Sequence, residues 1–187
     1  MKKVFIIACA FMILGIAQNA NAQLTASAGV VIALPLGDFG DFASLGAGLS
    51  AEGEFAVSDN LAVTANLGFI SLFVDDELSD LIASSFLIPI HAGARYYLDD
   101  NEGGLYGMAK VGVTSMSITT EDFDILGVTV EGETDSESNL SFGFGAGFLI
   151  TEAIDVSASF NIITAGDDDG AEASNYIGVR GAWRFGK

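Results

Sequence analysis

Residues Leu140–Ile150 read L-S-F-G-F-G-A-G-F-L-I, so bulky apolar residues alternate with small ones. Successive side chains of a β-strand point to opposite faces. The two faces therefore differ in bulk, with Phe142, Phe144 and Phe148 on one and Gly143, Gly145 and Gly147 on the other. Glycine within a strand gives up side-chain packing. Its repetition on a single face indicates that the space beside that face is narrow.

The same period-two alternation dominates the chain from residue 24 onward, and helical periodicity is hard to find. Eight strands are predicted, at residues 24–34, 45–57, 61–73, 86–98, 105–118, 138–150, 154–164 and 174–186. Each is long enough for a tilted strand that crosses a bilayer, which takes roughly 9–11 residues.

The connections between these strands alternate between short and long. The short ones are 58–60, 99–104 and 151–153, and the long ones are 35–44, 74–85, 119–137 and 165–173. Short turns on one rim and long loops on the other are typical of outer-membrane barrels. The predicted fold is therefore all-β, an eight-stranded antiparallel up-and-down transmembrane β-barrel that occupies residues 23–187.

The N-terminal segment has the three parts of a secretory signal peptide. It starts M-K-K, continues through the apolar run Val4–Ala17 and reaches the small-x-small site Ala20-Asn21-Ala22. The alternative is a membrane anchor, for which Val4–Ala17 is short. We expect residues 1–22 to be removed, and the single cysteine, Cys9, to leave with them.

Composition limits the classes of partner. The formal net charge of the 187-residue chain is −18, and removal of Lys2 and Lys3 makes it −20. Such a charge argues against nucleic acid as a partner. Half of the residues are hydrophobic and the mean hydropathy is +0.48, yet no segment after the signal approaches a membrane-spanning helix.

Charged residues within the predicted strands share the small-residue face. They are Glu52, Glu54, Arg95, Lys110, Asp155, Arg180 and Arg184, and His91 lies on the same face. In a soluble barrel this face would meet water, but seven charges over eight strands are too few to cover a solvated surface. An eight-stranded barrel has an interior only wide enough for side chains. We therefore expect the apolar face to meet lipid and the charges to face the lumen.

Three acids and four bases at similar depth should form ion pairs, because an unpaired charge in a narrow lumen is unfavourable. Arg95 and Arg184 are expected to lie within reach of Glu52, Glu54 or Asp155. A plug that fills the lumen is the favoured interpretation. A gate, or a narrow pore weakly modulated by these cations, is the alternative.

Two further features concern the barrel rims. Aromatic girdles are expected, with Phe55, Tyr96, Tyr97, Tyr106, Trp183 and Phe185 near the short turns and Phe69, Phe73, Phe86 and Tyr176 near the long loops. The outer half of the small-residue face carries apolar residues instead of polar ones: Ile70, Leu72, Leu87, Met116 and Ile118. A bulge or simple packing explains them better than a small apolar pocket for a lipid-like ligand.

No catalytic, cofactor or metal site is predicted. His91 is the only histidine, it maps to mid-strand, and no G-x-S-x-G motif is present. The four long loops contain seventeen of the 25 acidic residues, and the densest run is Asp167–Glu172. That run lacks the spacing of a calcium loop. Together the loops are candidates for divalent ions shared with lipopolysaccharide, or for a basic partner.

Three segments carry a resemblance to a known family: F-L-I-P-I-H-A-G-A-R-Y-Y-L at 86–98, L-Y-G-M-A-K-V-G-V at 105–113 and Y-I-G-V-R-G-A-W-R-F at 176–185. The chain resembles the outer-membrane β-barrel domain family, the small OmpA/OmpX-type eight-stranded barrels, in versions from Bacteroidetes-like bacteria. The resemblance implies a place in the bacterial outer membrane, contact with its lipid, and assembly by the outer-membrane insertion machinery. That machinery reads a terminal aromatic, whereas here Phe185 is followed by Gly186 and Lys187.

The expected function is a non-enzymatic structural or surface-interaction role in the outer membrane, with acidic outer loops that face a partner. One alternative is a narrow porin-like channel. Another is a lipid-binding or lipid-modifying barrel that uses the outer part of the lumen.

Overall fold

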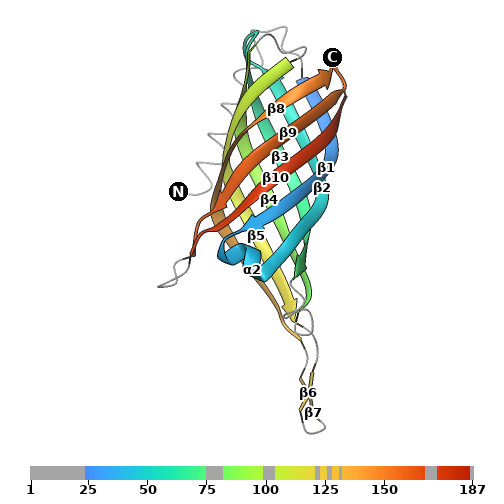
Figure 1. Ribbon diagram of the computed structural model, residues 1–187, viewed down its shortest axis with the longest axis vertical. Helices are drawn as coiled ribbons and strands as arrows, with labels where there is room; N and C mark the ends of the chain where they lie inside the picture. Colours follow the sequence, from blue (N-terminus) through green and yellow to red (C-terminus); the bar gives the residue numbers. More distant parts are fainter. Residues whose placement is uncertain are drawn as a thin grey trace, which may run out of the picture.

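Eight antiparallel strands close into a barrel in the computed structural model, which describes residues 24–74, 82–98, 104–120, 123–125, 128–130, 132–166 and 172–185. The barrel strands are β1 (Leu24–Leu36), β2 (Ala43–Ala56), β3 (Leu61–Val74), β4 (Ile82–Tyr97), β5 (Gly104–Thr120), β8 (Thr134–Thr151), β9 (Ile154–Ile163) and β10 (Ser174–Phe185). Neighbours in sequence are neighbours in the sheet, and β1 pairs with β10 to close it (Figure 1). The predicted fold class is confirmed, while the predicted signal peptide lies outside the described residues.

Two small elements lie at the long-loop end of the barrel. They are the five-residue helix α2 (Asp38–Phe42) and a hairpin of β6 (Phe123–Ile125) and β7 (Val128–Val130), and neither was predicted. Figure 1 places both at the end opposite to the C-terminus. Within the described residues, no helix is long and apolar enough to cross a membrane.

Strands β5 and β8 extend further toward the long-loop end than predicted, to Thr120 and from Thr134. A ladder of hydroxyl pairs joins them there: Ser115 with Ser138 at 2.7 Å, Ser117 with Ser136, and Thr119 with Thr134 at 3.0 Å. These serines and threonines lack the apolar alternation that marks the membrane-spanning part. The sequence pattern therefore ended the strands too early.

The apolar face of the strands points outward. Leu67, Ile90 and Phe144 keep between 52% and 57% of their surface exposed, although they lie in the middle of their strands. The glycines of the small-residue face, such as Gly68 and Gly145, point inward, and the strands approach each other closely there. A Cβ added to Gly145 would collide with the carbonyl oxygen of Ala158, and one added to Gly68 would lie 2.9 Å from Pro89 Cγ. The orientation inferred from the sequence is confirmed.

The predicted aromatic girdles are correct only in part. Tyr96 and Trp183 are exposed on the outer wall at the short-turn rim. Tyr97, Tyr106 and Tyr176 are instead buried inside the barrel, so their assignment to the girdles was wrong. The reason is the strand alternation, which places Tyr97 on the same inward face as Arg95.

The long-loop half of the lumen is filled by apolar side chains. The cluster consists of Ala33, Phe39, Ala43, Ile70, Leu72, Leu87, Ile163 and Tyr176, and Phe39 reaches into it from α2. The register shifts are confined to the strand ends, at Ala43/Leu45, Ile82/Ser84 and Leu149/Thr151. Ile70, Leu72 and Leu87 therefore keep the parity of their strands. Simple packing therefore explains them, because the bulges or irregularities at this rim, at Ala43/Leu45 and Ile82/Ser84, lie at the strand ends and leave these residues on the inward face.

Candidate functional site in the barrel lumen

An ionic network fills the short-turn half of the lumen, and Arg95 is its centre. This β4 side chain is only 2% exposed. Its guanidinium forms ion pairs with Glu52, with Glu54 at 3.2 Å and with Asp155 at 3.0 Å. The three carboxylates come from β2 and β9, so a single cation from a third strand joins two separate parts of the barrel wall.

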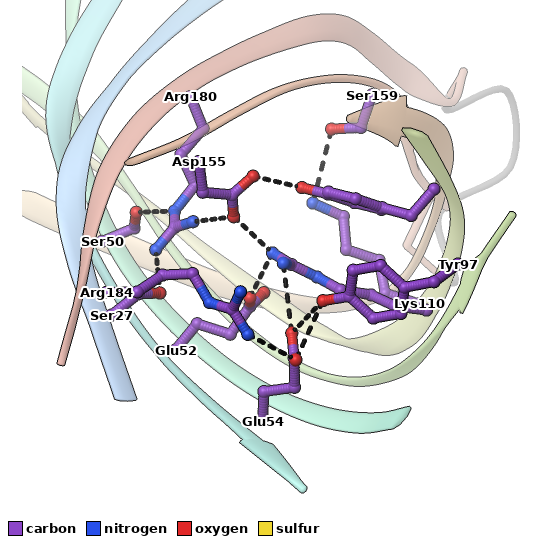
Figure 2. Close-up of polar contacts among 12 residues, drawn as sticks. Ser27, Ser50, Glu52, Glu54, Tyr97, Lys110, Asp155, Ser159, Arg180 and Arg184 are labelled. Atoms are coloured by element: carbon purple, nitrogen blue, oxygen red, sulfur yellow. Dashed lines mark hydrogen bonds and ion pairs between the residues drawn. The ribbon is translucent and has the colours of Figure 1, made fainter. Parts of the chain in front are cut away.

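Two arginines of β10 complete the ion pairs, as Figure 2 shows. Arg180 pairs with Asp155 at 3.3 Å and donates hydrogen bonds to the hydroxyls of Ser50 and Ser27, each at 2.7 Å. Arg184 pairs with Glu54 at 2.9 Å. Arg95 and Arg184 thus both reach the carboxylates that the sequence assigned to them.

Two tyrosines that the sequence analysis placed in the girdles belong to this network. The Tyr97 hydroxyl donates to both carboxylate oxygens of Glu54 at 2.8 Å, and the Tyr106 hydroxyl donates to Asp155 at 2.5 Å. The Tyr106 ring also lies under the Arg95 guanidinium, 4.4 Å from its centroid to Cζ. Their parity with Arg95 and Lys110 was the signal that could have identified them.

Lys110 does not join the ion pairs, contrary to the expectation that all four bases would be paired. It comes from β5, and its Nζ donates only a long hydrogen bond, 3.5 Å, to Ser159 (Figure 2). Among the described residues no carboxylate lies within 4.0 Å of this ammonium group. Asp155 and the Oε1 atom of Glu52 are already bound by arginines.

His91 lies at mid-lumen in a short chain of hydrogen bonds. Its Nε2 is 2.7 Å from Ser141 Oγ, which also accepts a hydrogen bond from Thr114 at 2.9 Å. A catalytic serine–histidine pair needs a third group that orients the imidazole. In the described part of the chain the Nδ1 atom of His91 has no hydrogen-bond partner. His91 and Ser141 are at most 4% exposed.

The described residues contain no group of three or more histidine, cysteine or acidic side chains arranged to hold a metal ion. Most of the acidic run Asp167–Glu172, the densest in the sequence, lies outside the described residues. The polar side chains of the lumen can cross-link the strands of the barrel wall. Side chains of β1, β2, β4, β5, β9 and β10 are held together across the barrel axis by charge-assisted hydrogen bonds, which are stronger than neutral ones.

Comparison with known proteins identifies the family of this chain and other structures of the same fold. A family model described as "Outer membrane protein beta-barrel domain" matches residues 6–185. No curated protein sequence matches the chain.

Solved structures of similar fold come from other bacterial outer-membrane proteins. The N-terminal β-barrel domain of Pseudomonas aeruginosa OprF is 14% identical with a TM-score of 0.60, over 88% of this chain and 99% of that chain. Ail, the attachment invasion locus protein of Yersinia pestis, solved with the heparin analogue sucrose octasulfate, is 17% identical with a TM-score of 0.61 over the same shares. Neisserial surface protein A is 13% identical with a TM-score of 0.50, over 88% of this chain and 96% of that chain. At these identities the likeness shows the fold alone.

Proposed function

Because this chain belongs to the outer-membrane β-barrel domain family and lies in the bacterial outer membrane, we propose a non-enzymatic surface-interaction role for it. In this proposal the lumen is closed and the acidic outer rim binds a basic partner. The contents of the lumen and the charge of the rim support the two parts separately.

The observation that carries the proposal is the filling of the lumen by two successive layers. The ionic network around Arg95 occupies the short-turn half, and the apolar cluster, with Phe39 of α2, occupies the long-loop half. Ions cross an apolar constriction poorly, because they lose their hydration without gaining partners. A barrel with this interior is suited to present its loops rather than to transport solutes.

Conductance in planar lipid bilayers tests the closed lumen. We expect the folded, wild-type protein to give no sustained single-channel current in molar potassium chloride. Regular openings of wild-type protein would favour the alternative of a narrow porin-like channel. The wild-type protein is compared with a Phe39→Ala, Ile70→Ala variant, in which two large side chains are removed from the apolar cluster and the ionic network is unchanged.

The outer rim provides a pocket that fits a basic side chain. This pocket, about 180 Å³ in volume, lies between β5, β8, β9 and β10. Its lining combines acidic groups with apolar ones, namely Asp135, Glu137 and Glu172 with Met116, Ile118 and Ile163. Lysine and arginine lay an aliphatic stem on apolar surface while the charged end stays polar. The pocket offers both environments at once.

The acidic groups at this rim lie close enough together to affect the protonation of Glu172. The pKa of Glu172 is raised above its ordinary value, because its carboxyl shares a hydrogen bond with Asp38 and lies close to that second negative charge. A bound cation would relieve the repulsion between Glu172 and Asp38. The rim therefore favours a partner with positive charge.

The charge of the loops of this chain argues against a ligand like the one in the Ail structure. That protein was solved with a heparin analogue, which is a polyanion. In the present chain the four long loops, residues 35–44, 74–85, 119–137 and 165–173, contain seventeen acidic residues and neither lysine nor arginine. A sulfated polymer would be repelled here. Basic protein segments, or divalent ions shared with lipopolysaccharide, fit better.

Binding of an oligolysine peptide to the protein in lipid nanodiscs tests the partner chemistry. Exposed ion pairs contribute about 0.2–1 kcal/mol each, so Glu137→Gln with Glu172→Gln should weaken binding roughly two- to thirtyfold. Glu152→Gln, at the short-turn rim, removes the same type of charge on the other side of the membrane and should leave the affinity unchanged. Equal loss in both variants, or preferential binding of heparin, would contradict the proposal.

A further inference from the structure

A cavity separates the ionic network from the apolar cluster. Its volume is about 50 Å³, and a single water needs roughly 10–15 Å³ on this measure. Its charged lining residues are Lys110, Arg95, Arg180 and Glu52, and its neutral polar ones are Ser50, Thr64, Asn66, Ser157, Ser159 and Asn161. The cavity is therefore large enough for a monatomic ion with one or two waters, and too small for an organic ligand.

Two of the cations that line this cavity have N–H groups that are not fully used in hydrogen bonds. Lys110 carries three N–H donors, and its single hydrogen bond, to Ser159 Oγ, is 3.5 Å long. Arg95 is 2% exposed, and its Nε has no acceptor among the described residues. Buried polar groups are hydrogen-bonded in the great majority of proteins. Because both unused groups are donors, the partner that suits the cavity is an acceptor.

The charge balance indicates that this acceptor is negative. Four lumen-facing cations, Arg95, Arg180, Arg184 and Lys110, oppose three carboxylates, Glu52, Glu54 and Asp155, in the described lumen. One of these carboxylates, Glu52, also lines the cavity, and its Oε1 is bound by Arg95. The cations therefore exceed the carboxylates by one charge, and Lys110 is the cation that has no carboxylate within 4.0 Å among the described residues. Burial of an unpaired charge is strongly unfavourable.

We propose that the lumen cavity is a binding site for one small inorganic anion of the halide class, held beside Lys110. The anion compensates the fourth base and accepts hydrogen bonds from N–H groups of Lys110 and Arg95 for which the described side chains provide no acceptor. The site goes beyond the surface role proposed above, because it concerns the stability of the barrel and requires no outer partner.

Bromide replaces chloride chemically and is located by its anomalous scattering. In crystals of the wild-type protein grown or soaked in sodium bromide, we expect one anomalous peak inside the barrel, at ion-pair distance from Lys110 Nζ. The peak should be absent from Lys110→Met and retained in Lys110→Arg, which keeps the positive charge. Arg184→Met is the matched control: it also removes one lumen cation, but from a residue that does not line the cavity.

A solution measurement covers the case in which Lys110→Met fails to yield crystals. The folded fraction after heating is followed by gel mobility in sodium chloride and in sodium gluconate of equal ionic strength. The midpoint temperature of unfolding should be higher in chloride than in gluconate for the wild type and for Lys110→Arg. In Lys110→Met the apparent chloride affinity should fall about tenfold or more, as expected for loss of a charged hydrogen-bond partner.

The proposal is overturned if wild-type crystals in bromide show only water in the cavity, without anomalous signal. It is also overturned if chloride stabilises Lys110→Met as strongly as the wild type, because the effect would then be a general one of salt. Neither result affects the binding of a basic partner to the outer rim, so the two proposals fail independently.

Discussion

Replacement of Arg95 by methionine tests the lumen network most directly. Arg95 is 2% exposed and contacts three carboxylates and the ring of Tyr106. Methionine keeps much of the volume and removes the charge. Loss of one partner from a buried ion pair typically destabilises a protein by about 3–5 kcal/mol, because the remaining charges are left without compensation. We expect Arg95→Met to lose an amount in this range.

The measurement is unfolding by urea in detergent micelles or lipid vesicles. The chain has a single tryptophan, Trp183, which is 53% exposed on the outer wall, so its fluorescence reports the loss of the apolar environment. With a urea dependence of about 2 kcal/mol per molar, the predicted loss lowers the midpoint by roughly 1.5–2.5 M. Gel mobility of unheated samples gives the folded fraction independently.

Two further variants separate this explanation from general damage. Arg184→Met removes one ion pair from Glu54, which still keeps Arg95 and Tyr97 as partners, so its midpoint should fall less. Glu52→Gln in the Arg95→Met background removes a carboxylate that has lost its arginine partner. It should therefore restore part of the lost free energy of unfolding. A change below about 1 kcal/mol in Arg95→Met, the value typical of exposed pairs, would refute the reasoning.

Three other predictions concern packing, lipid contact and catalysis. Gly145→Ala should lower the folded yield and destabilise by at least about 1–3 kcal/mol, because its Cβ would collide with Ala158 O, whereas Gly53→Ala meets nothing within 4 Å and should be neutral; equal thermal midpoints would contradict this. Phe144→Arg, on the lipid-exposed wall, should destabilise the barrel in vesicles by about 2–4 kcal/mol, and no change in the urea midpoint would argue against lipid contact. His91→Ala should leave any release of fatty acid from phospholipid at the background level of the wild type, and a wild-type activity that this variant abolishes would reverse the non-enzymatic assignment.

Much of the fold follows from local properties of the sequence. The alternation of bulky apolar residues with small or polar ones, as in Phe142, Gly143 and Phe144, recurs in the membrane-spanning part of the strands. It depends only on side chains that point to opposite faces of one strand. Composition then decides which face is inside, because an eight-stranded lumen has no room for phenylalanines at every second position. The charged residues of the lumen could be identified for the same reason.

Local alternation reports the face of a residue and not its depth or its neighbours. Partners in the lumen are far apart in the chain: Arg95 and Glu52 are separated by 43 residues, and Arg184 and Glu54 by 130. Which of them meet depends on the stagger of eight tilted strands, a property of the closed barrel as a whole. Parity in the sequence gives the inward face of Tyr97 and Tyr106, but only the tertiary structure shows that they contact Glu54 and Asp155. The same stagger left Lys110 without a carboxylate at ion-pair distance among the described residues, although the sequence assigned it the same face as Arg95.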